Sequence, residues 1–229
     1  MQKTQPQKQH PTDWTSKLAC EARGLIKNLD EHPMAQRLFK GIIDSNSYAR
    51  WLVQTYHAVR WTSPLLKKAG RRLKRLGRHP QLAELLLQKT NEERGHERWL
   101  LADLRNQGWT LEQVERSKPS PAVVAYVAWN RFTSEVGSPT AFLGTGYMLE
   151  SLSVHRAGVT VEKLLERGAI PNIRKSVTFL RGHAGADGGH VAELTAVLRT
   201  LTDPAEQADI LLSARTTGVL YSGFFPEVS

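Results

Sequence analysis

Apolar residues recur at intervals of three and four along almost the whole chain, the spacing that lines one face of an α-helix. The stretch from Tyr48 to Val59 shows this most clearly, and Ser45 or Asn46 just before it suits a helix cap. No run of residues alternates between apolar and polar in the way that a half-buried strand does. The pattern therefore predicts an all-α fold, a helical bundle.

Prolines, glycines and short polar residues divide this pattern into elements. Pro33, Pro80, Pro121 and Pro204 stand where the periodicity begins, which suits a residue with a fixed φ and no backbone N–H. The expected helices span residues 13–29, 33–43, a long stretch from 45 that Pro64 kinks, 81–107, 110–117, 121–136, 139–167, 172–201 and 203–221. No linker divides them, so we expect residues 12–229 to form one domain behind a disordered tail of residues 1–11.

Length and composition indicate the size of the core and the cellular compartment of the protein. A length of 229 residues is enough to bury a substantial core and an internal pocket. The single cysteine, Cys20, excludes an internal disulfide framework and a metal site built from thiolates. Neither a signal-peptide pattern nor an apolar stretch long enough to span a membrane is visible. We therefore expect a protein of the cytoplasm.

The net charge of +9 raises nucleic acid as a partner. Seven of the cations fall between positions 67 and 78: Lys67, Lys68, Arg71, Arg72, Lys74, Arg75 and Arg78. On a helix most of them would form a solvated stripe around buried leucines, and on this interpretation nucleic acid is not an expected partner. The alternative is that the stripe docks an acidic partner, such as nucleic acid, an anionic membrane surface or an acidic carrier protein.

Three potential metal ligands stand at helical spacing in one octapeptide, His183-Ala-Gly-Ala-Asp187-Gly-Gly-His190. Positions i, i+4 and i+7 return to one face of a helix, so two imidazoles and a carboxylate would form a single stripe. The histidines would lie ~10 Å apart along the axis, which suits two neighbouring metals better than one. The glycines in this stretch leave two alternatives, a glycine-rich loop with incidental histidines or a helix whose histidines are ordinary core groups.

Two further groups extend the ligand set. Glu93-Arg-Gly-His96 places a carboxylate and an imidazole at i, i+3 on one helix face, although this pair is also common on surface helices. Glu150 lies in a mostly apolar stretch, where a buried carboxylate needs a cation, either a metal or an arginine. Together the groups supply three carboxylates and three imidazoles, a mixture that suits iron or manganese better than zinc or copper. Two divalent ions would need a fourth anion, for which hydroxide, a substrate carboxylate and Asp103 are candidates.

The residues Glu93-x-x-His96, Glu150 and His183-x₃-Asp187-x₂-His190, in this order on successive helices, resemble the pattern of the heme-oxygenase-like di-iron oxidases and oxygenases. The resemblance extends over about residues 48–225, and its most specific part is the last motif followed by Val-Ala-Glu-Leu. It implies a heme-oxygenase-like fold of about seven core helices, two weakly held Fe(II) ions, with manganese as an alternative, and O₂ as co-substrate.

Similar enzymes N-oxygenate amines and guanidines, fragment amino acids, convert amino acids to nitriles or cleave fatty acids to alkenes. The expected activity is therefore the O₂-dependent oxidation of a small carboxylate-bearing substrate: an amino acid, an amine or a fatty acid. An external electron donor and a homodimer are compatible with this expectation.

Further residues are expected to serve this activity. Some members of the family carry a glutamate on the helix before the Glu-x-x-His motif, where this chain has Tyr56 and His57, and we expect these two to act on the substrate or to add a ligand. Arginines on the core helices are candidates to hold a substrate carboxylate bidentately, namely Arg60, Arg131, Arg156 and Arg181. Candidates for an aromatic pocket wall are Trp51, Trp61, Trp129, Tyr126, Tyr147 and Phe179.

Three other functions remain open. A metal-free enzyme of the same fold, like thiaminase II or the quinone-cofactor synthase, would not need Asp187 between two histidines. A heme-binding oxygenase would need a histidine on the first helix, and residues 13–29 contain none. A non-enzymatic, basic helical adaptor is the third.

Overall fold

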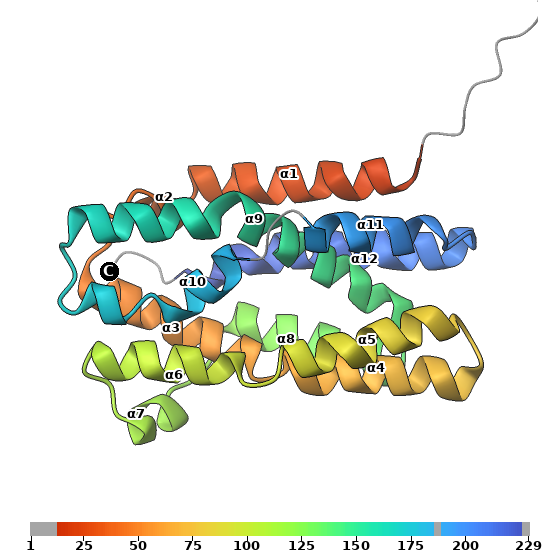
Figure 1. Cartoon of the computed structure of the whole chain (residues 1–229), viewed down its shortest axis with the longest axis horizontal. Helices are drawn as coiled ribbons and strands as arrows, with labels where there is room; N and C mark the ends of the chain where they lie inside the picture. Colours follow the sequence, from red (N-terminus) through yellow and green to blue (C-terminus); the bar gives the residue numbers. More distant parts are fainter. Residues whose placement is uncertain (1–12, 186–188, 226–229) are drawn as a thin grey trace, which may run out of the picture.

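The structure, a computed structural model, describes residues 13–185 and 189–225, and these form helices and connecting turns without a strand (Figure 1). This confirms the all-α prediction, while the expected tail of residues 1–11 lies outside the described residues. The α-helices are α1 Thr15–Glu31, α2 Pro33–Phe39, α3 Ser45–Val59, α4 Thr62–Leu76, α5 Pro80–Glu92, α6 His96–Asn106, α7 Leu111–Arg116, α8 Pro121–Glu135, α9 Phe142–Arg167, α10 Thr178–Ala184, α11 Gly189–Arg199 and α12 Pro204–Tyr221. Short 3₁₀ turns occupy Pro139–Ala141, Ile173–Lys175 and Ser222–Phe224.

Three long helices expected from the sequence are each divided in the structure. The stretch from 45 breaks between α3 and α4, and Pro64 lies in the first turn of α4, where its missing N–H leaves no hydrogen bond unmade. The expected helix 81–107 ends at Glu92 and restarts at His96, because Gly95 adopts a left-handed φ of 95° that helices exclude. The expected helix 172–201 was also wrong, since α10 ends at Ala184 and α11 begins at Gly189.

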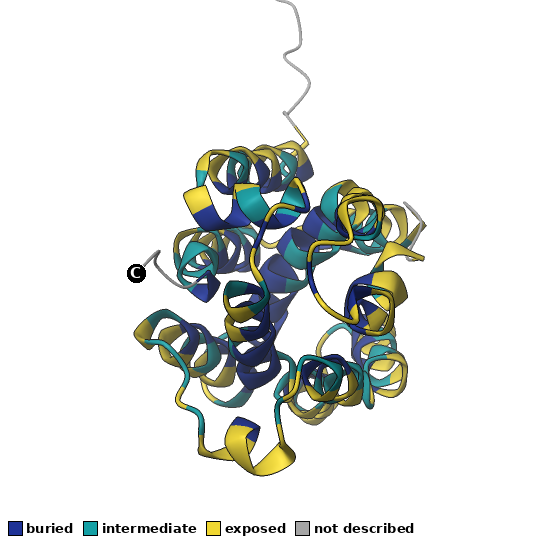
Figure 2. Cartoon of the chain, turned by 90° about the vertical axis from the view of Figure 1, so that its left-hand side faces the viewer, coloured by how far each residue is buried: buried dark blue, intermediate teal, exposed yellow. Residues whose placement is uncertain are grey.

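The helices pack as one bundle around α9, which contacts α1, α10 and α12 along its length. Figure 2 shows the buried faces of the helices turned toward the centre of the bundle. One of these contacts depends on a glycine, because a Cβ at Gly144 would lie 2.1 Å from the Ile210 carbonyl oxygen of α12. The close approach of α9 and α12 holds the middle of α9, where Glu150 is found, in a fixed position.

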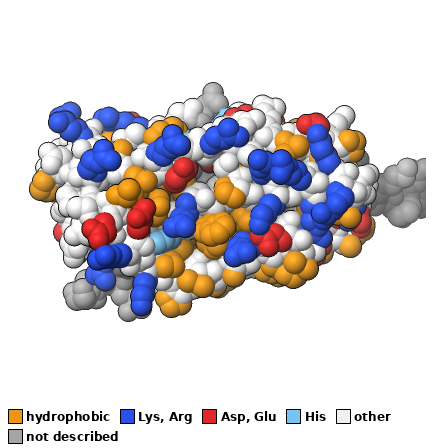
Figure 3. Space-filling model, turned by 90° about the horizontal axis from the view of Figure 1, so that it is seen from below, with side chains coloured by type: hydrophobic (Ala, Val, Ile, Leu, Met, Phe, Trp, Pro, Cys, Tyr) orange, Lys and Arg blue, Asp and Glu red, His pale blue; other side chains and the backbone are white. Residues whose placement is uncertain are grey.

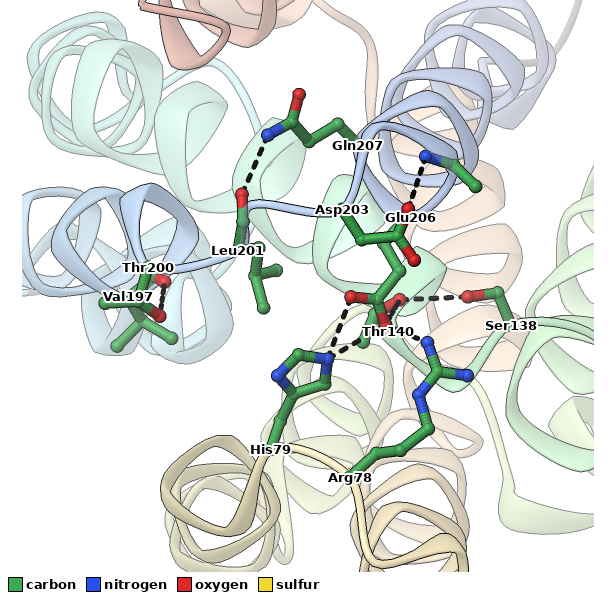
Figure 4. Close-up of polar contacts among 11 residues, drawn as sticks. Arg78, His79, Ser138, Thr140, Val197, Thr200, Leu201, Asp203, Glu206 and Gln207 are labelled. Atoms are coloured by element: carbon green, nitrogen blue, oxygen red, sulfur yellow. Dashed lines mark hydrogen bonds and ion pairs between the residues drawn. The ribbon is translucent and has the colours of Figure 1, made fainter.

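The turn between α4 and α5 is tied to the start of α12 by a buried carboxylate (Figure 4). Glu206, which is 3% exposed, forms ion pairs with Arg78 and with His79, whose Nε2 lies 2.8 Å from the carboxylate. His79 has a left-handed φ of 47° and directly precedes Pro80 at the first position of α5. A buried carboxylate needs such partners, and these partners fix where α5 begins.

The cationic stripe of α4 faces outward. Its buried residues are apolar, with Leu65, Leu66 and Leu73 on the inner face, and Lys68 and Lys74 form ion pairs with Glu135 and Glu84. Figure 3 shows that cationic, acidic and apolar side chains are interspersed on the face of the molecule seen from below Figure 1. Among the described residues, no helix combines the length and the apolar character that crossing a membrane requires.

Candidate metal centre

Three of the expected ligands converge at one point of the bundle interior. One ligand atom from each of Glu93, His96 and His183 lies within 4.8 Å of the other two. Glu93 directly follows α5, His96 opens α6 and His183 lies in α10, so three separate segments supply the group. An ion bound by one carboxylate and two imidazoles would have the type of coordination that iron, manganese and zinc accept.

The break between α5 and α6 places the first two of these ligands. Glu93 caps the C-terminus of α5 and His96 is the first residue of α6, with Gly95 turning the chain between them. Their Oε2 and Nδ1 atoms lie 3.0 Å apart. The i, i+3 proximity that the sequence suggested is therefore present, but a turn between two helices produces it and not a shared helix face.

Aromatic contacts orient the two imidazoles. The Trp99 ring stacks on His96 with centroids 4.1 Å apart, and the His183 ring lies edge-on to His96 at 5.1 Å. The Nδ1 atom of His183 hydrogen-bonds the Phe179 carbonyl oxygen at 2.9 Å, which leaves Nε2 as its free ring nitrogen. The Trp99 ring fits only because residue 182 is glycine, since a Cβ there would lie 2.3 Å from the ring.

The protonation of these groups favours metal binding. Burial by itself would raise the pKa of Glu93, but the adjacent His96, His183 and Lys89 outweigh it and lower that pKa. Burial lowers the pKa of His183, although its hydrogen bond to the Phe179 carbonyl opposes the change. Both shifts favour an anionic carboxylate and a neutral imidazole, the forms in which the two residues bind metals.

A second, looser pair of ligands adjoins the first group. His190, in the first turn of α11, has its Nδ1 3.7 Å from the Glu150 carboxylate of α9. Burial raises the pKa of Glu150; the nearby carboxylate of Glu93 adds to the increase and His190 opposes it. Asp187, the third expected ligand of this half, lies outside the described residues. The histidines at 183 and 190 lie on different helices, so the expected stripe along one helix is wrong.

The surroundings of His96 Nδ1 indicate whether these residues suit a metal ion. The Nδ1 atom of His96 is buried without a hydrogen-bond partner, because its 3.0 Å contact with Glu93 is not aligned as a hydrogen bond. A cation bound between this nitrogen and the half-buried carboxylate of Glu93 would satisfy both groups. Glu93, His96 and His183 therefore fit one metal ion, and among the described residues they are the group of three whose ligand atoms lie close enough together to bind one.

Most of these candidate ligands line a cavity of about 210 Å³, although His96 is not part of its wall. Glu93, Glu150, His183 and His190 contribute to one part of its wall, together with Lys89 and Glu193. Much of the remaining wall is apolar and aromatic, including three of the aromatic residues expected to line a pocket: Trp51, Tyr126 and Phe179. Trp61, Trp129 and Tyr147 do not line it. The cavity joins the candidate metal ligands to a space that an apolar molecule could occupy.

Tyr56 and His57 do not face this cavity. Trp51, Thr55 and Ala58 of α3 line it, and positions 56 and 57 point elsewhere because successive helical residues are rotated by about 100°. His57 instead bonds Ser117 through Nε2 at 2.8 Å, and burial followed by the charge of Arg60 lowers its pKa. The expected contact of these two residues with the substrate or a metal is not formed.

The expected carboxylate clamps are also misplaced. Arg60, Arg131 and Arg181 are exposed and absent from the cavity lining. Arg60 and Arg131 lie over the Trp61 ring at 5.9 and 5.3 Å, which holds them on the outer surface. Arg156 does line the cavity, but both its Nε and Nη2 are bonded to Asp30.

Asp103, the expected fourth acid, has a structural role. It is fully buried and accepts hydrogen bonds from the backbone N–H groups of Thr178 and Phe179, each at 2.9 Å. These are the first N–H groups of α10, which have no partner within the helix. Asp103 therefore caps α10 and holds His183 in place, and it is not free to bind an ion.

Two charged residues that line the cavity, Lys89 and Glu193, were not predicted from the sequence. Lys89 lies four residues before Glu93 on α5, and Glu193 lies three residues after His190 on α11, so helical spacing could have identified both. In the structure their side chains form an ion pair at 3.6 Å, and Lys89 also pairs with Glu92 at 2.8 Å. Burial by itself would lower the pKa of Lys89, but Glu92, Glu193 and Glu150 raise it, so its ammonium group stays charged.

An all-helical bundle that surrounds a cavity with carboxylates and imidazoles defines a class of redox protein. The model of the iron-containing redox enzyme family matches residues 49–221, and the chain belongs to that family. The matched range includes all the described ligands. No curated protein matches the chain.

Solved structures show the fold. A domain of unknown function with a heme oxygenase-like fold from Shewanella denitrificans has a TM-score of 0.75 and 22% identity, covering 93% of this chain and 89% of its own. A TenA homologue from Pseudomonas syringae pv. tomato has a TM-score of 0.75 and 18% identity, covering 98% and 97%. The heme oxygenase from Leptospira interrogans has a TM-score of 0.70 and 20% identity, covering 93% and 98%. The chain therefore has the heme oxygenase-like fold.

Proposed function

We propose that this chain binds two iron ions next to its internal cavity and uses O₂ to oxidise a small carboxylate-bearing substrate. The observation that carries the proposal is the convergence of Glu93, His96 and His183, of which Glu93 and His183 also line the cavity. Bound iron would supply the one-electron chemistry with O₂ that side chains cannot perform.

The proposed metal ligands are the candidate ligands located above together with Asp187. Glu93, His96 and His183 hold one ion, and Glu150, His190 and Asp187 hold the other. Two Fe(II) ions carry four positive charges, and Glu93, Glu150 and Asp187 return three. Glu193 lines the same cavity and lies one helical turn from His190, so we assign it as the fourth carboxylate in place of Asp103.

Lys89 is the proposed partner of the substrate carboxylate. The lining contains two lysine or arginine residues among those described, Lys89 and Arg156. Arg156 is already held by Asp30, whereas the ammonium group of Lys89 has three donors and can exchange Glu193 for a substrate. A substrate carboxylate bound to Lys89 would lie beside the proposed metal ligands. The apolar walls of the cavity would exclude water from the rest of the substrate.

A metal-free reaction in the same cavity is the competing proposal, since a TenA homologue shares the fold. The chain's one cysteine, Cys20, is exposed on α1 and does not line the cavity, so thiolate chemistry is not available there. This reaction would also give no role to the convergence of Glu93, His96 and His183, which favours the iron-dependent proposal.

Iron stoichiometry and oxygen uptake test the proposal together. Metal-free protein is loaded with Fe(II) under anaerobic conditions, and the expected content is about two iron ions per chain. Amino acids and fatty acids are then added with O₂, and the true substrate should accelerate O₂ consumption. Lys89→Met should raise the KM for that substrate, whereas Arg60→Met, outside the cavity, should not. A chain that binds no iron, yet turns over a substrate, would support the metal-free alternative.

A further inference from the structure

One face of α9 forms part of the cavity wall. Its residues recur at intervals of three and four, so they lie on one side of the helix: Phe142, Gly146, Leu149, Glu150, Ser153 and Ala157. Gly146 stands one helical turn before the proposed metal ligand Glu150 and contributes no side chain to this wall. Because the positions one turn before and one turn after it both line the cavity, a side chain at residue 146 would point into the cavity.

Packing explains a neighbouring glycine of α9 but does not explain Gly146. A Cβ at Gly144 would lie 2.1 Å from the carbonyl oxygen of Ile210, so glycine is needed there for α9 to approach α12. A Cβ at Gly146 would meet no atom of the described residues within 4 Å, apart from its chain neighbours and the backbone of its own helix. Glycine is less favourable than alanine inside a helix, so the fold alone gives no reason for glycine at this position.

Helices α5 and α9 begin near a common point and extend toward the metal-binding part of the cavity. His79, just before α5, and Thr140, just before α9, both contact the carboxylate of Glu206, at 2.8 and 3.5 Å (Figure 4). Lys89 and Glu150 stand ten residues further along their respective helices, and both line the cavity. Equal numbers of residues along the two helices therefore correspond to similar distances from Glu206.

The wall across the cavity from Gly146 is apolar. Leu85 and Leu86 of α5 lie about one helical turn before Lys89, as Gly146 lies one turn before Glu150 on α9. Both leucines line the cavity. The open space at Gly146 therefore adjoins the Lys89 ammonium group on one side and hydrocarbon on the other. It suits the apolar chain of a molecule whose carboxylate pairs with Lys89.

We infer that Gly146 determines which substrates fit, because the space that it leaves open is the subsite for the apolar chain of the substrate. The inference rests on the proposed function, which assigns the cavity to a carboxylate-bearing substrate. It narrows that substrate to a carboxylate with an extended hydrocarbon chain, which passes between Gly146 and Leu85. An acid too short to reach Gly146 from Lys89 does not use the subsite.

Binding of two carboxylic acids to the full-length, metal-free protein tests the inference by NMR titration. The probes are butanoic acid and decanoic acid, which differ in the length of the hydrocarbon chain. Decanoic acid should bind the wild type at least tenfold more tightly, since each buried methylene contributes about fourfold. In Gly146→Leu the new side chain occupies the space of a few methylenes, so the affinity for decanoic acid should fall roughly ten- to hundredfold. The affinity for butanoic acid should change by less than about twofold, because four carbons end before the subsite.

Gly158→Ala is the matched control for a smaller change, Gly146→Ala. Gly158 also lies on α9 and has room for a Cβ, whose nearest neighbour would be the Cβ of Ala184 at 3.9 Å, but it does not line the cavity. Both alanine variants should raise the melting temperature by roughly 1–4 °C, because alanine favours a helix. Only Gly146→Ala should weaken the binding of decanoic acid, by about two- to fivefold.

Three results would overturn the inference: decanoic acid that binds the wild type no better than butanoic acid or not at all, undiminished binding of decanoic acid by Gly146→Leu, or equal losses for both acids in that variant. If Gly146→Leu does not fold, the comparison of Gly146→Ala with Gly158→Ala still decides the matter. Failure of the proposed function would be distinct, because binding is measured without iron or O₂. Iron-dependent O₂ consumption that does not change with the size of residue 146 would reject the subsite alone.

Discussion

The two sides of the cavity are built in different ways. The metal-binding side takes Glu93, His96 and His183 from the ends of short helices, with a turn at Gly95 between the first two and the end of α10 at Ala184 next to the third. The aromatic side takes Trp51 and Tyr126 from the interiors of α3 and α8, and Tyr221 from the last position of α12. The metal-binding side therefore gathers charged and imidazole groups at helix ends, whereas most of the aromatic side is formed by continuous helical faces.

This difference has a physical basis. Helix ends leave backbone groups without partners and permit left-handed residues, so side chains can converge there from several directions. Helix interiors project side chains at fixed angles and suit a wall that must stay packed. Metal coordination needs convergence, and an apolar wall needs close packing.

The largest effect is expected from removing one charge on the metal-binding side. Glu93→Gln keeps the shape of the side chain but removes the carboxylate that lies between two imidazoles. Since loss of residues that merely orient a ligand costs 10- to 100-fold in affinity, loss of the ligand itself should weaken Fe(II) binding by about 100-fold or more. Equilibrium titration with Fe(II) or Co(II) measures this.

Glu97→Gln is the matched control, because Glu97 lies in the first turn of α6 but outside the ligand group. Its metal affinity should stay within about twofold of the wild type, because the half-buried Glu97 carboxylate is not one of the converging ligands. Equal losses in the two variants would contradict the assignment of Glu93 as a ligand.

A smaller effect is expected where the metal-binding side is supported by packing. Gly182→Ala would place a Cβ 2.3 Å from the Trp99 ring, which stacks on His96. Overpacking of this kind should lower the free energy of unfolding by about 1–3 kcal/mol, and the displaced ring should weaken metal binding by roughly tenfold. Thermal unfolding and metal titration measure the two effects.

Gly185→Ala serves as the comparison, because a Cβ at that position has its nearest neighbour 3.9 Å away. The double variant Gly182→Ala, Trp99→Leu should recover stability but not metal affinity. If it recovers both, Trp99 does not orient His96.

The smallest effect concerns the aromatic side and appears only in alkaline solution. Burial raises the pKa of Tyr221 from 10.0 to about 12. Below pH 10 the hydroxyl is protonated in both the folded and the unfolded chain; between pH 10 and 12 the unfolded chain loses the proton first, so stability falls. Tyr221→Phe should remove this contribution, at most about 1.4 kcal/mol per pH unit. Urea unfolding at pH 8 and pH 11 measures it, and equal pH dependence in both proteins would contradict it.

The same contrast explains what could be predicted from the sequence. Apolar periodicity identified the helical fold and the location of nearly every helix, because burial of one helix face leaves a repeating pattern. It could not identify the break at Gly95, since a glycine within a periodic stretch is compatible with a helix at moderate cost. The aromatic residues Trp51, Tyr126 and Phe179 were expected in the pocket and line it.

Residue types in the sequence identified the candidate metal ligands more accurately than the residues expected to contact the substrate. Glu93, His96 and His183 could be selected together from the sequence, because histidine and glutamate are uncommon in an apolar interior. The structure brings the three together. Tyr56, His57 and the three exposed arginines were misplaced, since the direction in which a side chain points depends on the rotation of its helix within the bundle. Asp103 was misassigned because a buried acid can cap a neighbouring helix that is far away in the sequence.

The junction between α5 and α6 also constrains how this chain can vary in length. A residue inserted or deleted in the turn between Glu93 and His96 would change the short path by which Gly95 brings these two side chains together, since one residue extends the chain by up to about 3.8 Å. Relatives with this ligand arrangement should therefore keep the number of residues between Glu93 and His96 constant. Gaps in an alignment should fall instead in the connection that contains α7, which supplies no ligand.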